Sequence, residues 1–177
     1  MATRYIMTAF GSDRPGIVAD VTRLLFENGC NLEDNSMTLL ADEFTLILLF
    51  SCADSSVEER LLQECRRLER DKGISAFIRP LKARQDAATA GVVPCVLHVE
   101  GLDQAGIVFK VSQYLADKNV NIIDLNSKVK ESPESGTALY LMDIDVRVPK
   151  SLSFDQLEAG LASVADELHV DINLTRS

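Results

Sequence analysis

The sequence contains an internal repeat, and this repeat constrains the fold more than any other feature. The segment 11–36 matches the segment 101–126 without a gap when the chain is shifted by 90 residues. Two glycines, two aspartates and an asparagine recur, which is a more specific match than the apolar pattern of two similar helices. The repeat therefore predicts two copies of one small domain. The shared residues pair Gly11 with Gly101, Asp13 with Asp103, Gly16 with Gly106, Ile17 with Ile107, Val18 with Val108, Val21 with Val111, Leu25 with Leu115, Asn31 with Asn121 and Asp34 with Asp124.

Each copy shows the same order of patterns, which predicts an α+β fold. Apolar residues at helical spacing predict two helices per copy, and short apolar or alternating runs predict four strands. The order β-α-β-β-α-β is that of the ferredoxin-like fold, a four-stranded antiparallel sheet with both helices on one face. The predicted strands are 5–10, 32–40, 44–52, 74–81, 96–101, 121–129, 138–148 and 169–174, and the helix residues predicted to be buried are Ile17, Val21, Leu25, Ile107, Val111 and Leu115.

The segment 82–91 has no apolar period, and we predict that it links a first domain, 1–81, to a second, 92–177. The net charge of −9 disfavours nucleic acid as a partner. The sequence shows no apolar run long enough to span a membrane and no cleavable leader at its start. The four cysteines, Cys30, Cys52, Cys65 and Cys95, form no CxxC pair and are interpreted as reduced, buried residues. A cytoplasmic location follows as the expectation.

Catalytic patterns are scarce, so we predict that the chain is not an enzyme and needs no cofactor or metal. The two histidines, His98 and His169, lie in predicted strands without metal-ligand spacing. Acylphosphatases share the strand order, and Arg14 and Asn31 resemble their functional pair, but Gln104 replaces Arg14 in the repeat and the phosphate loop is missing. RNA-recognition modules need exposed aromatic residues on the central strands, and with 6% aromatics no such pair is expected.

The loop between the first strand and the first helix is the strongest candidate for a ligand site. Segments 11–16 and 101–106 each place a glycine at a helix entrance, where backbone N–H groups and the helix dipole favour an anion. An asparagine and an aspartate on the next strand could receive an ammonium group, so the set suits a free amino acid. A purely structural explanation stays open, in which the aspartate caps the helix, the glycine packs and the asparagine closes a turn. The candidate ligand residues are Asp13, Gly16, Asn31, Asp34, Asp103, Gly106, Asn121 and Asp124.

The segments 13–18 and 29–32 resemble the hallmark of ACT domains, and 103–108 with 121–122 is a weaker match to it. A tandem of this length is similar to the glycine cleavage system transcriptional repressor family. The resemblance implies domains that pair edge to edge and bind a small amino acid at the seam, between the first loop of one domain and the second strand of its neighbour. It also implies control of a transcription activator by protein contact rather than by DNA binding.

Together these observations predict a tandem ACT protein that senses glycine or a similar amino acid and changes its affinity for a regulatory protein partner. A homodimer is possible under this reading. Two alternatives stay open: a constitutive protein-interaction module with vestigial ligand loops, and an acylphosphatase-like hydrolase. The ligand loops also differ between the copies, since Arg14 and Pro15 become Gln104 and Ala105, which weighs against two equivalent sites.

Overall fold

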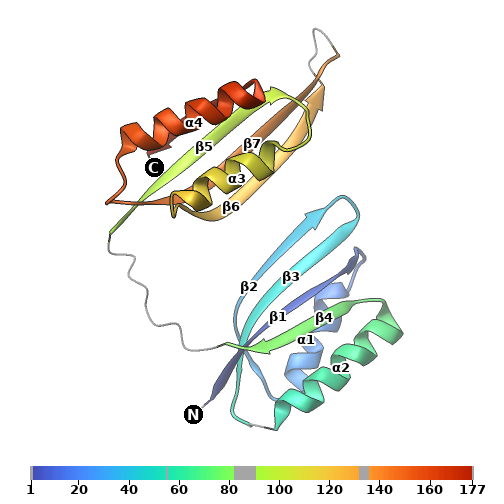
Figure 1. Ribbon diagram of the computed structural model, residues 1–177. Helices are drawn as coiled ribbons and strands as arrows, with labels where there is room; N and C mark the ends of the chain where they lie inside the picture. The colour runs from blue at the N-terminus through green and yellow to red at the C-terminus, as the bar shows by residue number, and fades with distance from the viewer. Residues whose placement is uncertain (1, 55, 82–90, 132–135, 177) are drawn as a thin grey trace. The chain divides into compact units, whose positions relative to one another are not determined.

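The computed structural model of the chain describes residues 2–54, 56–81, 91–131 and 136–176. The chain divides into two compact units, Met1–Gln85 and Asp86–Ser177 (Figure 1). The predicted linker, 82–91, lies outside the described residues except for Gly91. The residues at which the first domain ends and the second begins are therefore not tested, and the limits 1–81 and 92–177 stay predictions.

The first unit has the predicted βαββαβ order. Its antiparallel sheet has the strand order β2-β3-β1-β4, so β2 and β4 are the edge strands. Both helices cover one face of the sheet (Figure 1), and the buried residues of β1 and β3 accordingly alternate with exposed or partly exposed ones. The elements are β1 (Thr3–Ser12), α1 (Ile17–Glu27), β2 (Asn31–Leu40), β3 (Glu43–Cys52), α2 (Val57–Lys72) and β4 (Ser75–Pro80).

The second unit repeats this arrangement with the strand order β6-β7-β5-β8, which confirms the predicted ferredoxin-like pair. Most of its strand ends lie beyond the predicted ones, because backbone pairing with the neighbouring strand continues past the last apolar residue. The predicted loop 130–136 is shortened by this extension and lies partly outside the described residues. The elements are β5 (Val92–Leu102), α3 (Ile107–Asp117), β6 (Asn121–Glu131), β7 (Ala138–Pro149), α4 (Phe154–Leu168) and β8 (Val170–Arg176).

Each unit has its own apolar core between the helices and the covered sheet face. The helix residues predicted to be buried are buried in both copies, none more than 3% exposed. The second helix of each unit adds one leucine with no exposed surface, Leu61 in α2 and Leu157 in α4. The recurrence of apolar periodicity therefore reflects two separate cores of the same design.

Gly11 and its counterpart Gly101 recur because the sheet approaches another backbone segment there. A Cβ on Gly11 would lie 2.9 Å from the carbonyl oxygen of Gly73, and one on Gly101 would lie 3.1 Å from the Cα of Val170. In each unit this contact joins the end of the first strand to the start of the last one. The glycine pair at the head of the repeat is thus structural, and it was not among the candidate ligand residues.

Candidate functional site

The helix that follows the first strand begins without a capping side chain in both units. The N-cap residue of α1 is Gly16, with φ of 88°, and that of α3 is Gly106, with φ of 97°. Both glycines lie in the left-handed region that favours glycine, and both are exposed. The structural alternative in which Asp13 caps the helix does not hold, since Gly16 occupies the cap position. Each helix start therefore offers an exposed, positively polarised end.

The candidate aspartates of the loops are held through their backbone, which leaves their carboxylates exposed. The Asp13 N–H donates to the carbonyl of Asp42 at 2.8 Å, in the turn between β2 and β3. The Asp103 N–H donates to the carbonyl of Ala138 at 3.1 Å, at the start of β7. The first loop of each unit is thus fixed beside the β2–β3 or β6–β7 hairpin.

The residue after each aspartate ties the loop to a helix, which is α1 in the first unit and α4 in the second. The Arg14 guanidinium pairs with Asp20 at 2.7 Å, and Lys72 at the end of α2 lies 3.8 Å from the same carboxylate. The hydrogen bond from Arg14 lowers the pKa of Asp20 below its ordinary value. In the second unit the Gln104 side chain donates to the carbonyl of Leu168, at the end of α4. Arg14 is therefore engaged within the fold, which weighs against its use as a phosphate ligand.

Asn31 and Asp34 lie on the exposed edge strand β2, far from the loop of their own unit. The register places Asn31 opposite Ser51, whereas the end of β1 pairs with Glu43. At a rise of about 3.4 Å per residue, these two ends of β3 are roughly 25 Å apart. A single unit thus does not bring Asp13 and Gly16 together with the two β2 residues.

The second unit separates its candidate residues in the same way. Asn121 lies opposite Arg147, and Leu102, at the end of β5, pairs with Leu139. Asp124 accepts a hydrogen bond from the Asn126 side chain at 2.5 Å. Like-charge repulsion acts on Asp124 as well, because its register partner is Asp145. The two copies therefore share the geometry of the site but not its charge.

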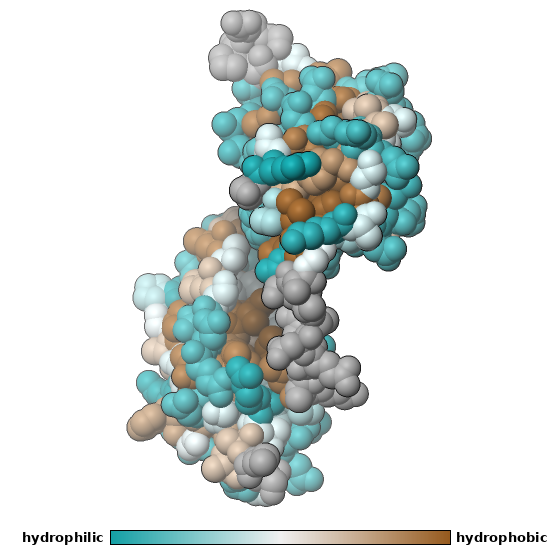
Figure 2. All heavy atoms as spheres, turned by 90° about the vertical axis from the view of Figure 1, so that its left-hand side faces the viewer, coloured by the Kyte–Doolittle hydropathy of each residue, from teal (hydrophilic) through white to brown (hydrophobic). Residues whose placement is uncertain are grey.

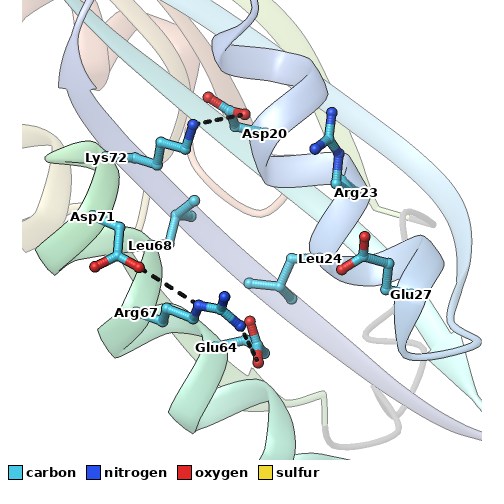
Figure 3. Close-up of a pocket in the computed structure, with 9 residues that line it drawn as sticks. All are labelled: Asp20, Arg23, Leu24, Glu27, Glu64, Arg67, Leu68, Asp71 and Lys72. Atoms are coloured by element: carbon cyan, nitrogen blue, oxygen red, sulfur yellow. Dashed lines mark ion pairs between the residues drawn. The ribbon is translucent and has the colours of Figure 1, made fainter.

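A groove of about 260 Å³ lies between α1 and α2 (Figure 3). Leu24 and Leu68 form its apolar floor, and charged side chains of both helices form its walls. Several of these charges are paired with each other, as in the contact of Arg67 with Asp71 at 3.5 Å. The groove is lined by residues other than the candidate ligand set, and its ion pairs suit a solvated helix surface.

A second groove, of about 510 Å³, runs between α1 and the exposed edge strand β2. Phe26 of α1, Cys30 and Leu32 line part of it, and Phe26 is 82% exposed. Sequence reasoning missed this apolar groove, because Phe26 and Leu32 read as members of ordinary amphipathic patterns. Cys30 and Leu32, which line the groove, flank Asn31 at the start of β2.

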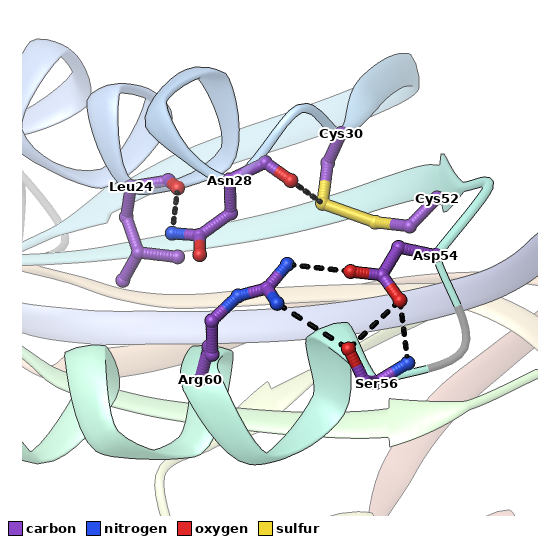
Figure 4. A network of polar contacts seen from close by, with 7 residues as sticks. All are labelled: Leu24, Asn28, Cys30, Cys52, Asp54, Ser56 and Arg60. Carbon is purple, nitrogen blue, oxygen red and sulfur yellow. Dashed lines mark hydrogen bonds and ion pairs between the residues drawn. A yellow bond between two sulfur atoms is a disulfide. The ribbon is translucent and has the colours of Figure 1, made fainter.

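The prediction that all four cysteines are reduced is wrong for Cys30 and Cys52, which a disulfide joins (Figure 4). The spacing of these cysteines shows no motif, but the hairpin register carries a signal, since continuing it by one residue places Cys30 opposite Cys52. Cys65 and Cys95 are buried and free, as predicted. Burial raises the pKa of the Cys65 thiol to about 11.

The exposed faces of the two sheets differ in chemistry. Phe10 on β1 and Phe77 on β4 stack at 6.0 Å on the first sheet, 42% and 66% exposed. This exposed aromatic pair differs from the pair that RNA-recognition modules carry on their central strands, because Phe77 lies on the edge strand β4. On the second sheet the exposed face instead carries His98, 2.5 Å from Asp143. Figure 2 shows apolar surface interspersed with hydrophilic surface on both units.

The described part of the chain holds neither a metal site nor a membrane-spanning helix. Across residues 2–54, 56–81, 91–131 and 136–176, no group of three or more His, Cys, Asp or Glu side chains could hold a metal ion. Over the same ranges, no helix is both long enough and apolar enough to cross a bilayer.

Two ferredoxin-like units, each with a glycine-led helix start and an exposed edge strand, define a tandem of small α+β domains of one kind. The ACT-domain sequence profile matches residues 3–79. The UPF0237 protein of Methanopyrus kandleri is 33% identical over 78 residues, which cover 44% of this chain and 87% of that protein. The chain therefore belongs to the ACT-domain family.

Relatives of full length support the tandem arrangement. The glycine cleavage system transcriptional repressor of Escherichia coli is 26% identical over 166 residues, 93% of this chain and 85% of the repressor. A crystal structure of an unknown protein from Galdieria sulphuraria superposes with a TM-score of 0.79 and 28% identity, covering 100% of this chain and 99% of that one. A structure provisionally assigned as such a repressor shares the fold at a TM-score of 0.72 and 23% identity.

Proposed function

We propose that this chain is a cytoplasmic regulatory protein, not an enzyme, that senses glycine or a similar small amino acid. It passes the signal on by contact with a protein partner, a transcription activator of glycine metabolism. The observation that carries the proposal is the exposed, uncapped helix start at Gly16, repeated at Gly106. The likeness to the E. coli repressor supports the regulatory role.

The amino acid carboxylate is the group that suits the helix start. Backbone N–H groups of the first helical turn point out of α1 there, and the helix dipole favours a negative charge. Gly16 has no Cβ, so a ligand can approach its backbone closely, and the space around the missing Cβ is empty to 4 Å. The ammonium group then needs an acceptor that the same unit does not supply nearby.

Pairing of edge strands would supply that acceptor. β2 is an exposed edge, and if it pairs antiparallel with β2 of a second copy, the start of each strand lies beside the end of the other. The end of β2 leads into Asp42, whose carbonyl holds the Asp13 loop. Asn31 and Asp34 of one copy would then face the Asp13–Gly16 loop of the other. We therefore propose a homodimer whose ligand sites are shared between copies.

Glycine, alanine and serine are expected to raise the melting temperature of the protein, whereas acetate and methylamine, each with one of the two charges, are not. A ligand at 100 times its dissociation constant contributes about 2.7 kcal/mol if it binds the folded state alone. For a domain of this size that corresponds to roughly 10 °C or more. The measurement is a melting screen of the common amino acids. If none of them shifts the transition, the sensor is rejected and the interaction-module alternative stands.

Amino-acid binding and partner binding are expected to be coupled equally in both directions. The ligand touches two copies at once, so it favours the arrangement in which they pair, and it shifts that equilibrium by its differential affinity. With the same contribution of about 2.7 kcal/mol, the partner affinity changes roughly a hundredfold. Titration of the purified activator of the glycine cleavage genes, with and without saturating glycine, measures this. Equal affinities under both conditions would contradict the coupling while leaving amino-acid binding intact.

A further inference from the structure

The Cys30–Cys52 disulfide closes the free end of the β2–β3 hairpin in the first unit (Figure 4). The other end of the hairpin is closed by the turn after Leu40. All ten residues of β2 are exposed, and the strand makes little contact with α1. The disulfide is therefore a covalent tie on an edge strand whose residues are all exposed.

The second unit builds the same structure without a disulfide. Continuing its register by one residue places Val120 opposite Val148, at the positions of Cys30 and Cys52, and both valines are buried. It also forms the same irregularity of register, between Ile122 and Asp124, as the first unit forms between Leu32 and Asp34. The fold thus does not require a disulfide at this place, because packing of two valines suffices.

The two sulfur atoms differ in access and in anchoring. Cys52 is 2% exposed and ends β3, and the chain after it is held by Asp54, which accepts hydrogen bonds from the Ser56 N–H and from Arg60, each at 2.8 Å. These hydrogen bonds lower the pKa of Asp54 to about 2, and the bond from the Ser56 N–H has the largest effect. Cys30 is half-buried and lines the groove between α1 and β2. A reagent can therefore reach Cys30, while Cys52 stays in place.

We propose that Cys30–Cys52 is a reversible thiol–disulfide exchange site, which takes a low-molecular-weight thiol as its substrate and tightens or releases the edge strand β2. This switch acts on the fold itself and does not need an amino-acid ligand. In a reducing compartment a disulfide is usually transient and regulatory rather than permanent, which agrees with the cytoplasmic location proposed above.

The exchange proceeds in two balanced steps. The thiolate of the small thiol attacks the Cys30 sulfur, the S–S bond breaks, and the electron pair leaves on the Cys52 sulfur, which takes up a proton. A second thiolate attacks the outer sulfur of this mixed disulfide and displaces the Cys30 thiolate, which is protonated in turn. Two small thiols are oxidised to their disulfide, and two cysteine thiols form. The Cys30 thiol then has an acceptor in place, the Asn28 carbonyl oxygen 3.8 Å away.

The test equilibrates the full chain in mixtures of reduced and oxidised glutathione, then measures alkylation of each cysteine and amide exchange of each strand. Before reduction Cys30 and Cys52 are expected to resist alkylation, and after it Cys30 reacts faster than Cys52. Reduction is expected to speed amide exchange of β2 about tenfold or more and to lower the melting temperature of the first unit by roughly 10 °C. Exchange of β6 is the internal control and stays unchanged.

The matched variant carries Cys30→Val and Cys52→Val, the pair that the second unit already uses. It is expected to fold and to show the same β2 exchange at every glutathione ratio. Three results would overturn the proposal: alkylation of Cys30 at full rate before reduction, a disulfide that stays closed in excess reduced glutathione, or β2 exchange that does not depend on the redox state. A glutathione response that persists in the valine variant would equally exclude this pair as its source.

Discussion

Replacing Leu61 with alanine is expected to destabilise the first unit by about 2–5 kcal/mol, because the substitution leaves a cavity in a small core. Leu61 has no exposed surface and packs in the cluster between α2 and the sheet. A loss of this size is a large part of the stability of a domain of about 80 residues. Urea unfolding followed by amide exchange of each unit measures it, and exchange throughout α2 and β1 should become markedly faster.

The neighbouring Leu62 is the matched control for this substitution. It lies on the same helix but is 40% exposed, so Leu62→Ala should change the free energy of unfolding by about 0.5 kcal/mol or less. Amide exchange of α4 and β5 should be the same in both variants if each unit relies on its own core. Equal destabilisation by the two substitutions would contradict the placement of α2 on the sheet.

Replacing Gly16 with alanine is expected to weaken amino-acid binding about tenfold or more, since the added methyl group fills space that the proposed ligand uses. The fold should accept the change, because the new Cβ meets no atom within 4 Å. The cost is backbone strain at a φ of 88°, about 1–2 kcal/mol. Calorimetric titration with the amino acid found in the melting screen measures the loss of affinity.

Two further variants separate ligand contact from backbone strain. Gly73→Ala introduces a similar strain at the end of α2, where φ is 66° and the new Cβ also meets nothing, and binding should persist. Gly106→Ala makes the same change in the second unit and should weaken amino-acid binding there. If Gly16→Ala and Gly73→Ala affect binding equally, strain rather than contact explains the result, and the proposed site at Gly16 is misplaced.

The elements and their buried faces could be predicted from the sequence because they depend on local periodicity. Ile17, Val21 and Leu25 recur at helical spacing, and such a stripe can be buried only against a sheet or another helix. The same reasoning holds for the alternation in β7, where Met142 and Ile144 are buried and the residue between them is exposed. Local patterns of this kind need no knowledge of the partner strand.

The candidate site could be predicted only in part, because its residues depend on long-range geometry. Gly16 was identified from its place before a helix, a local feature, and the structure places it at the exposed start of α1. The predicted neighbourhood of Gly16 and Asn31 does not occur within one unit, since strand order puts them at opposite ends of β3. The alternative role of Asp13 as a helix cap does not occur either, because Gly16, with a left-handed backbone, is the cap residue.

The sequence by itself thus determined two units, the order of their strands and helices, and the residues of their cores, because burial follows from side-chain periodicity. Only the tertiary structure decided which distant residues meet. A single irregularity in β2, between Leu32 and Asp34, shifts the register so that Cys30 rather than Asn31 continues opposite Cys52. A one-residue shift in a strand moves each side chain to the other face of the sheet. The irregularity therefore places Cys30 where it forms a disulfide with Cys52.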